Sequence, residues 1–224
     1  MIPRTLIDRA PMPDGSGELR LIRRGEEFSI MLGANELMNS RLSGSEEELA
    51  RIACERLKGR QRPAALIGGL GMGFTLRAAL AELGPDASVT VAELIPAVID
   101  WAKGPLAHIY GDSLVDPRVT VAEADVTDLI VRSDRAWDAI LLDVDNGPEG
   151  LSVAANNRLY DSAGLAAAKR ALRPGGILGI WSSDGDPRFT RRLERAGFAV
   201  QEVRARAARS GRGAHHLLWF ATRR

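Results

Sequence analysis

Three glycines spaced as G-x-G-x-G follow a short apolar run, and this pattern constrains the fold more than any other feature of the chain. The run 64–67 has the composition of a buried strand, Gly69, Gly71 and Gly73 come next, and a helical pattern begins at Phe74. Glycine lets the backbone turn tightly and lets a ligand lie against bare peptide groups, while the helix N-terminus offers unpaired N–H donors. This order predicts the opening of a nucleotide-binding βαβ unit, although glycine turns also join strands to helices for structural reasons alone.

An acid at the end of the next apolar segment strengthens this prediction. Residues 87–92 have the pattern of a second strand, and Glu93 follows them. It lies about twenty residues after the last glycine, where an acid in such folds accepts hydrogen bonds from ribose hydroxyls. The alternative is a solvated acid at a strand end. Glycine turn and acid together predict a nucleoside-containing cofactor.

From residue 62 onward, segments with strand and helix patterns alternate. This rhythm predicts an α/β fold with a doubly wound, mostly parallel seven-stranded sheet. No helix is expected between the last two strands, which predicts that they run antiparallel. Strands are expected at 64–69, 87–92, 118–123, 137–142, 176–182, 197–204 and 214–222, and helices at 73–83, 96–104, 126–132, 157–172 and 187–196.

The first 42 residues differ from this rhythm, because alternating apolar residues and glycine turns predict a small antiparallel β segment there. Strands are expected at 18–23, 27–32 and 36–38. A helix from Ser45, as N-cap, to about Lys58 follows, and Gly59 is expected to end it. We therefore divide the chain into an N-terminal β-hairpin segment, 1–42, and a cofactor-binding domain, 43–224.

Composition narrows the class of protein. Apolar residues make up 45% of the 224 residues, enough for the core of one large α/β domain. No apolar run approaches the length of a membrane span, and the N-terminus lacks the apolar core of a signal peptide. The single cysteine, Cys54, excludes an internal disulfide and is expected to be a buried small hydrophobe. These features predict a cytoplasmic protein that interacts with no membrane, and no metal site is expected.

Positive charge is concentrated near the C-terminus. Between residues 188 and 224 there are ten arginines and only two acids, although the net charge of the chain is +1. Such a surplus attracts phosphates or nucleic acid. Many of these arginines fall on one expected helix, where they also serve simply to keep the surface soluble.

Carboxylates follow two further strands at the edge where ligands collect in doubly wound folds. Asp125 is placed to accept from an exocyclic amine such as that of adenine, or to cap the helix that follows. Asp143 opens a turn that contains Asp145 and Asn146 and continues for longer than most such connections. This extra length favours a functional loop, so Asp143 is expected to line the reaction site.

From about residue 32 to 181 the chain resembles the spermidine synthase-like proteins, a branch of the class I S-adenosylmethionine-dependent methyltransferase fold. The matching pieces occur in the family's order, and this order makes the resemblance specific, because each piece alone is common. They are the glycine turn after Leu66-Ile67-Gly68, the segment Val91–Pro96, Asp116–Val119, Asp143 with Gly147-Pro148, Leu159-Tyr160, and the turn Leu172-Arg173-Pro174-Gly175-Gly176. The resemblance implies an S-adenosylmethionine-type cofactor and a homodimer.

The chain departs from this family at positions that hold the amine substrate of its aminopropyl-transferring members. Gly71 stands where those members have an aspartate, and Asn146 stands where they have a second one. Met38 stands in place of a glutamine that contacts the cofactor. Binding a cationic polyamine requires carboxylates, so these losses weaken the case for a polyamine acceptor.

The sequence therefore ranks an S-adenosylmethionine-dependent methyltransferase first, acting on a small-molecule or peptide acceptor. Polyamine aminopropyl transfer from decarboxylated S-adenosylmethionine ranks second, and a non-catalytic cofactor-binding or RNA-binding protein third. A nicotinamide-dependent oxidoreductase ranks fourth, because the last glycine of the dinucleotide pattern is missing.

Each candidate site residue has an expected role. Gly69, Gly71, Gly73, Glu93, Asp125 and Asp143 are expected to hold the cofactor, and Asp143 also to handle the acceptor's proton. Tyr160 is expected to orient the acceptor. The remaining acceptor-site candidates are Asp145, Asn146, Trp181, Asn39 and Arg41; the last two belong to an expected lid over the cofactor that also includes Ser40. His215 and His216 are a second possible acid–base source, or purely structural.

Overall fold

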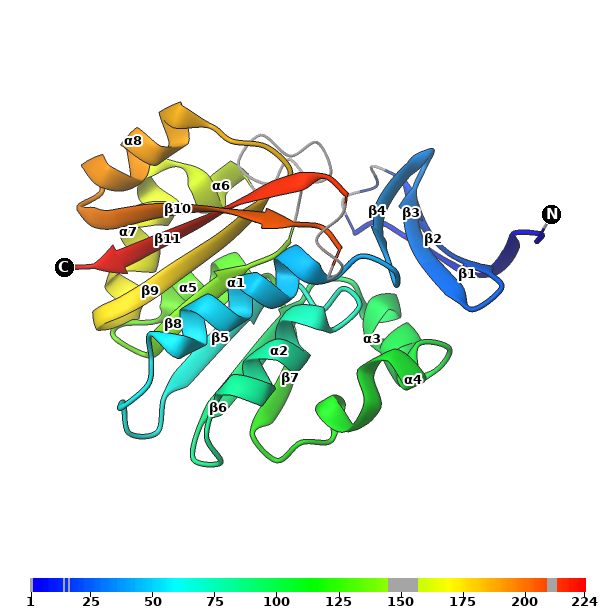
Figure 1. The fold of residues 1–224 in the computed structure, drawn as a ribbon, viewed down its shortest axis with the longest axis horizontal. Coiled ribbons are helices and arrows are strands. Elements are labelled where there is room, and N and C mark those ends of the chain that lie inside the picture. The colour runs from blue at the N-terminus through cyan, green and yellow to red at the C-terminus, as the bar shows by residue number, and fades with distance from the viewer. Residues whose placement is uncertain (1, 14, 16, 145–156, 209–212) are drawn as a thin grey trace.

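The computed structural model describes residues 2–13, 15, 17–144, 157–208 and 213–224 (Figure 1). Its centre is a seven-stranded sheet with the strand order β10-β11-β9-β8-β5-β6-β7. The strands are β5 (Ala64–Gly68), β6 (Ser88–Glu93), β7 (Val119–Glu123), β8 (Trp137–Leu142), β9 (Leu172–Ser182), β10 (Phe198–Arg206) and β11 (His215–Arg223). Strands β5 to β9 pair in parallel, and β11 runs antiparallel to both β9 and β10, which confirms the predicted fold class.

Helices cover both faces of this sheet. One face carries α1 (Gly44–Glu55), α2 (Phe74–Glu82) and α3 (Pro96–Lys103), and the other carries α5 (Val126–Arg132), α7 (Ser162–Ala171) and α8 (Pro187–Arg195). Alternate residues of one strand serve the two cores, since Ala65 and Ile67 belong to the first and Leu66 to the second. All three are fully buried, as expected for a central parallel strand.

A four-stranded antiparallel sheet precedes this unit, in the order β1-β2-β3-β4. Its strands are β1 (Thr5–Pro11), β2 (Glu18–Arg24), β3 (Glu27–Leu32) and β4 (Asn35–Asn39). The predicted β segment is thus present, but β1 was not expected, because its apolar and polar residues do not alternate and six of its seven residues are exposed. Leu21 and Ile30 pack into the core shared with α1 to α3, and the Trp101 indole donates to Asp8 at 2.7 Å. The small sheet is therefore fixed against the large one.

Several helix boundaries differ from prediction. Helix α1 begins at Gly44 with Ser43 as its N-cap residue, so the expected N-cap, Ser45, lies inside the first turn. It ends at Glu55, because the next N–H groups bond to carbonyls three residues back and form tight turns. The short helices α4 (Ala107–Tyr110) and η1 (Gly111–Leu114) were not predicted, since four-residue elements carry no readable period.

The helix expected over 157–172 is two helices, α6 (Asn157–Tyr160) and α7. Asp161 separates them, because its side chain accepts from the Gly164 N–H at 2.8 Å and caps α7. Strand β9 then starts at Leu172, so the residues expected to form a turn before the fifth strand belong to the strand itself. The Leu172 carbonyl accepts from Arg223, and Leu172 pairs with Trp137 across the sheet.

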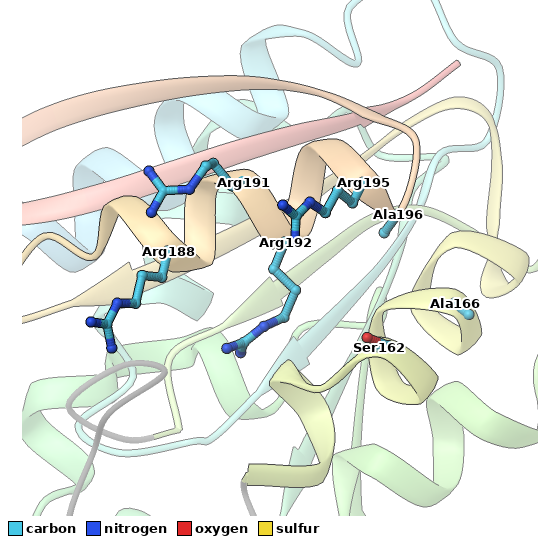
Figure 2. Close-up of a pocket in the computed structure, with 7 residues that line it drawn as sticks. All are labelled: Ser162, Ala166, Arg188, Arg191, Arg192, Arg195 and Ala196. Atoms are coloured by element: carbon cyan, nitrogen blue, oxygen red, sulfur yellow. The ribbon is translucent and has the colours of Figure 1, made fainter.

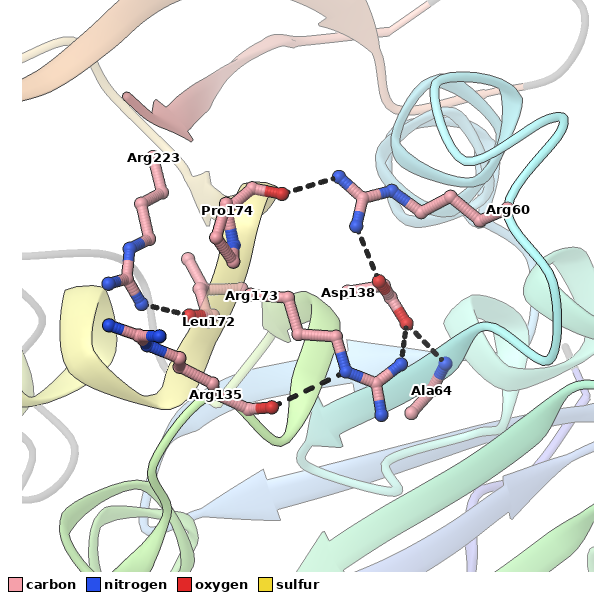
Figure 3. A network of polar contacts seen from close by, with 8 residues as sticks. All are labelled: Arg60, Ala64, Arg135, Asp138, Leu172, Arg173, Pro174 and Arg223. Atoms are coloured by element: carbon pink, nitrogen blue, oxygen red, sulfur yellow. Dashed lines mark hydrogen bonds and ion pairs between the residues drawn. The ribbon is translucent and has the colours of Figure 1, made fainter.

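At the amino ends of the central strands, the carboxylate of Asp138 holds three segments together (Figure 3). It accepts from Arg60 and Arg173 at 2.6 Å each and from the Ala64 N–H at 2.9 Å, and its side chain is 3% exposed. Arg60 also donates to the Pro174 carbonyl. We call these residues the Asp138 cluster. A buried carboxylate with two charged partners is satisfied, and losing it would leave both arginines without this partner.

None of the helices in the described part of the chain is long and apolar enough to cross a membrane.

Candidate active site

A cavity of about 350 Å³ lies at the carboxyl ends of the parallel strands, under the N-terminal sheet. Residues after β5, β6, β7, β8 and β9 all line it, and Met12, Leu19 and Ile30 from the small sheet close it on another side. The direction of winding changes between β5 and β8, since the chain proceeds from β5 to β6 and β7 on one side and to β8 and β9 on the other. Ligands of doubly wound folds bind at such a switch point, and this volume suits a nucleoside-sized molecule.

The glycine turn forms one wall of this cavity. Gly69, Gly71 and Gly73 line it with φ angles of +86°, +52° and +75°. A Cβ on Gly69 would stand 2.5 Å from the Asp143 carbonyl oxygen, and one on Gly73 would stand 2.4 Å from Tyr110 Cε1. The turn therefore needs glycine both for its left-handed backbone and for close approach of its neighbours.

Two departures from the family pattern touch each other. The Met38 sulfur lies 3.0 Å from the point that a Cβ on Gly71 would occupy, and both residues line the cavity. In this chain Met38 thus occupies space that an aspartate side chain at position 71 would need.

Glu93 is nearly buried, at 7% exposed, and both of its oxygens accept backbone hydrogen bonds. Oε2 accepts from the Leu70 N–H and Oε1 from the Ile95 N–H, each at 2.9 Å. Burial raises the pKa of the Glu93 carboxyl, and the backbone N–H groups oppose that rise. Glu93 therefore fixes the glycine turn to the end of β6 while it lines the cavity.

Asp125 caps α5, which is one of the two roles that its sequence position suggested. Its Oδ1 accepts from the Thr127 N–H at 2.8 Å and caps α5, and the same residue lines the cavity. Arg158 lies within ion-pair distance, at 3.9 Å, but its side chain is 67% exposed. An exposed pair at this distance contributes little energy, so Asp125 remains free to face a ligand.

Asp143 lies at the end of β8 and lines the cavity next to the glycine turn. Its Oδ2 accepts from the Thr75 hydroxyl at 2.8 Å, and Thr75 lies in the first turn of α2. Burial raises the pKa of the Asp143 carboxyl to about 6, and the Thr75 hydrogen bond opposes this rise. A carboxyl group with such a pKa exchanges protons readily near neutral pH.

Glu46, in the first turn of α1, also lines the cavity. Burial, together with the nearby charge of Asp143, raises the pKa of Glu46 to about 7. Its approach to Asp143 brings residues 97 positions apart in the chain into one site, and no local pattern signals such a contact.

The charge of the lining is one-sided. Five carboxylates line the cavity, and the described lining residues include neither lysine nor arginine. These carboxylates are Glu36, Glu46, Glu93, Asp125 and Asp143. His216, half-buried on β11, is the one titratable base among them. Ionised carboxylates lower the energy of a nearby cation, so the charge of this lining favours positively charged ligands over negatively charged ones.

Some of the other predicted acceptor-site residues line the cavity, and others do not. Trp181 lines the cavity, and so does Asn39. The Asn39 side chain, however, is bonded to the backbone N–H groups of Arg41 and Leu42 and to Glu36, so it shapes the turn after β4. Arg41 is exposed, pairs with Glu27 and Glu36, and is absent from the described lining. Asp145 and Asn146 lie outside the described residues.

The contacts of Ser40, in the expected lid of residues 39–41, and of Tyr160 are structural ones. Ser40 accepts from the Phe28 N–H, which ties this segment to β3. Tyr160 is 2% exposed and packs edge-on against Phe189 in the core beneath α7 and α8, with ring centroids 5.7 Å apart. It is not among the described lining residues of the cavity.

The C-terminal arginines form a separate basic surface on α8. Arg188, Arg191, Arg192 and Arg195 border a second hollow with Ser162 and Ala196 (Figure 2). Arg192 donates to the Tyr160 carbonyl at 3.0 Å, so one of these side chains holds α8 against α6. This hollow shares no described lining residue with the acidic cavity. In the described part of the chain, no cluster of three or more residues suited to metal binding occurs.

Several known proteins are similar to this chain in sequence. No family model matches the chain. The polyamine aminopropyltransferase of Mycobacterium tuberculosis is 31% identical over 194 residues, which cover 82% of this chain and 35% of that protein. The polyamine aminopropyltransferase 1 of Streptomyces coelicolor is 32% identical over 147 residues, which cover 61% of this chain and 26% of that protein.

Solved structures share the fold. The spermidine synthase of Thermotoga maritima superimposes with a TM-score of 0.75 at 18% identity, over 98% of this chain and 73% of that one. A spermidine synthase bound to the transition-state analogue AdoDATO gives 0.74 at 17% identity, over 98% and 72%. The chain belongs to the spermidine synthase-like proteins. It spans about a third of the length of the curated relatives it matches, so a spermidine synthase-like fold does not by itself assign their activity to it.

Proposed function

We propose that this protein transfers an aminopropyl group from decarboxylated S-adenosylmethionine to an amine acceptor. The observation that supports this most directly is the acidic lining of the cavity, which faces a donor and an acceptor that are both cationic. The sequence alone ranks methyl transfer first, because Gly71 and Asn146 replace acceptor-binding aspartates. Glu46, which the sequence interpretation did not consider, restores a carboxylate to the same cavity, and the relatives are named aminopropyltransferases.

In this proposal the chain's residues divide the work. The glycine turn, Glu93 and Asp125 hold the adenosyl part, and Asp143 accepts a proton from the acceptor amine so that its lone pair is free. The donor supplies a sulfonium-activated carbon, so alignment of the two substrates accounts for most of the required catalysis. Thr75 keeps the Asp143 carboxylate in place through its 2.8 Å hydrogen bond.

Donor preference is the decisive test. S-adenosylmethionine carries a carboxylate that the decarboxylated form lacks, and a charge about 6 Å from one like charge costs about 3 kcal/mol at an effective dielectric constant of 20. We therefore expect calorimetry to show that the decarboxylated form binds about 100-fold more tightly. Equal or tighter binding of S-adenosylmethionine would overturn the proposal in favour of methyl transfer.

Turnover provides the second test. Mass spectrometry of the full chain with the decarboxylated donor and a simple diamine is expected to detect an aminopropylated amine. Asp143→Asn should lower the rate by at least about 100-fold, within the range that one acid–base group contributes, while donor binding persists. Asp128→Asn is the matched control, because Asp128 is exposed on α5 and forms only a loose pair with Arg132.

The basic surface on α8 supports a different hypothesis, namely binding of nucleic acid. Four arginines along one helix provide the charge that such binding requires, and the same charges also suit a solvated surface. Retention of RNA that falls steeply with salt, and that is lost on Arg188→Glu with Arg191→Glu, would support this function. The predicted homodimer likewise stays a prediction, which sedimentation of the full chain would measure.

A further inference from the structure

A serine in the first turn of α1 joins three side chains that line one end of the cavity. The Ser45 Oγ lies 2.6 Å from Glu46 Oε2, 2.8 Å from His216 Nδ1 and 2.9 Å from Trp181 Nε1. Ser45 is itself fully buried, and its three partners come from α1, β11 and β9. The Trp181 and His216 rings also pack edge to face, with centroids 4.6 Å apart. The proposed reaction uses none of these hydrogen bonds.

Two arrangements of the hydrogen atoms matter in this cluster, one with Glu46 ionised and one with the Glu46 proton on Oε2, the oxygen that faces Ser45. A serine hydroxyl has one hydrogen to donate and two lone pairs, and an indole N–H only donates, so Trp181 always occupies one lone pair. One hydrogen and one lone pair remain for Glu46 and His216. If Glu46 is ionised it must accept, and His216 must then donate from Nδ1. If Glu46 is protonated and donates, Ser45 must donate to a bare Nδ1, and the His216 proton lies on Nε2.

We propose that a cationic amine binds beside Glu46 and Asp143 and, on binding, drives one proton from Glu46 through Ser45 to His216. In this step the Glu46 proton moves to Ser45 Oγ, the Ser45 proton moves to His216 Nδ1, and the Nε2 proton leaves to water. Glu46 becomes negative as the cation arrives, and His216 ends neutral with its proton on Nδ1. The inference rests on the proposed function only for its choice of a cationic acceptor.

The surrounding charges are consistent with this switch. Burial, and after it the charges of Asp143 and Glu47, disfavour ionisation of Glu46, so without a cation about half of the Glu46 side chains hold a proton near pH 7. Around His216, burial and His215 lower the pKa of the imidazole, while Asp184 opposes them. His216 therefore does not keep a second proton near neutral pH, and the proton that it receives from Ser45 is passed on. A cation between Glu46 and Asp143 stabilises the ionised Glu46 carboxylate, which offsets its burial and the repulsion from Asp143.

The first experiment needs no ligand. In the full chain labelled with ¹⁵N-histidine, the ring nitrogen shifts report the tautomer, and His216→Gln identifies the signal among the three histidines. We expect His216 to change from Nε2–H to Nδ1–H as the pH rises through about 7. Ser45→Ala should abolish this change, and Glu48→Gln, which removes a pair with Arg51 away from the cavity, should leave it intact. A tautomer that stays the same across this range would overturn the proton switch, whatever reaction the protein catalyses.

The second experiment adds 1,4-diaminobutane as the probe. Calorimetry near pH 7 in buffers of different ionisation enthalpy measures the protons released per diamine bound. We expect about half a proton, because about half of the Glu46 side chains are then protonated, and none for Glu46→Gln. Release that is unchanged in Glu46→Gln, or a diamine that does not bind, would overturn the role of the cation. The donor preference described above would still stand or fall separately.

Discussion

Replacing Gly73 by alanine tests whether the glycine turn is held by contact as well as by backbone conformation. Gly73 has φ of +75°, and an added Cβ would stand 2.4 Å from Tyr110 Cε1 and 2.5 Å from Cδ1. Tyr110 cannot move freely, since it is 2% exposed and its hydroxyl donates to the Gly71 carbonyl at 2.6 Å. The substitution therefore forces either the ring or the turn to shift.

The expected cost follows from three contributions. A left-handed alanine costs about 1–2 kcal/mol, overpacking against a buried ring about 1–3 kcal/mol, and a lost hydrogen bond about 1 kcal/mol. Since these contributions overlap, we expect a loss of about 3–4 kcal/mol in the free energy of unfolding. With a urea dependence of about 2–3 kcal/mol per molar, the unfolding midpoint falls by about 1–2 M.

Gly59→Ala is the matched control. Gly59 also has a left-handed backbone, with φ of +91°, but nothing lies within 4 Å of the Cβ that would be added. This variant measures the backbone cost alone and should lose about 1–2 kcal/mol. If urea denaturation gives the same loss for both variants, the contact with Tyr110 contributes nothing and the argument from close approach is refuted.

Three further predictions concern stability and reactivity. Asp138→Ala should lower the free energy of unfolding by about 3 kcal/mol in urea denaturation, because it leaves Arg60 and Arg173 without their buried partner. Asp128→Ala removes an exposed pair 3.8 Å apart and should change the free energy of unfolding by less than about 0.5 kcal/mol. Equal effects would contradict a structural role for the Asp138 cluster. Because burial raises the pKa of Glu46 from 4.5 to about 7, the folded protein holds this proton more tightly than the unfolded chain does. The resulting contribution to stability is complete below about pH 4.5 and is lost as the pH rises through 7. Glu46→Gln should flatten that part of the plot of stability against pH, and an unchanged plot would argue against this role of Glu46. Burial also raises the pKa of the Cys54 thiol to about 12, so a thiol reagent should modify native protein far more slowly than urea-unfolded protein, and rapid modification of the native chain would show that Cys54 is accessible.

The central fold was predictable because its strands carry the pattern themselves. Strand β8 matches the predicted range, and helix α5 does as well. Boundaries failed where a side chain makes a specific contact, as at Asp161, whose cap on α7 divides one expected helix into two. Strand β1 was missed because its strand character comes from pairing with β2 rather than from an apolar face.

The site was predictable only where residues follow the ends of parallel strands, because sheet topology brings those ends together. The glycine turn, Glu93, Asp125 and Asp143 are brought together in this way. Glu46 and His216 lie on α1 and on an antiparallel strand, so their meeting depends on how distant elements pack. Ser45 shows the same limitation: a serine before three glutamates is a typical N-cap pattern, and its actual partners lie 136 and 171 positions away.

The central sheet places stability and chemistry, two demands that compete in many enzymes, at opposite ends of its strands. At one rim the Asp138 cluster joins the strands through fully satisfied charges, and at the opposite rim carboxylates crowd together at an energetic cost. Substitutions at the carboxyl ends of the strands can therefore change the chemistry, while the amino ends of the strands preserve the fold. An engineer who seeks new acceptors should vary Glu46, Met38 and Trp181 and leave the Asp138 cluster untouched.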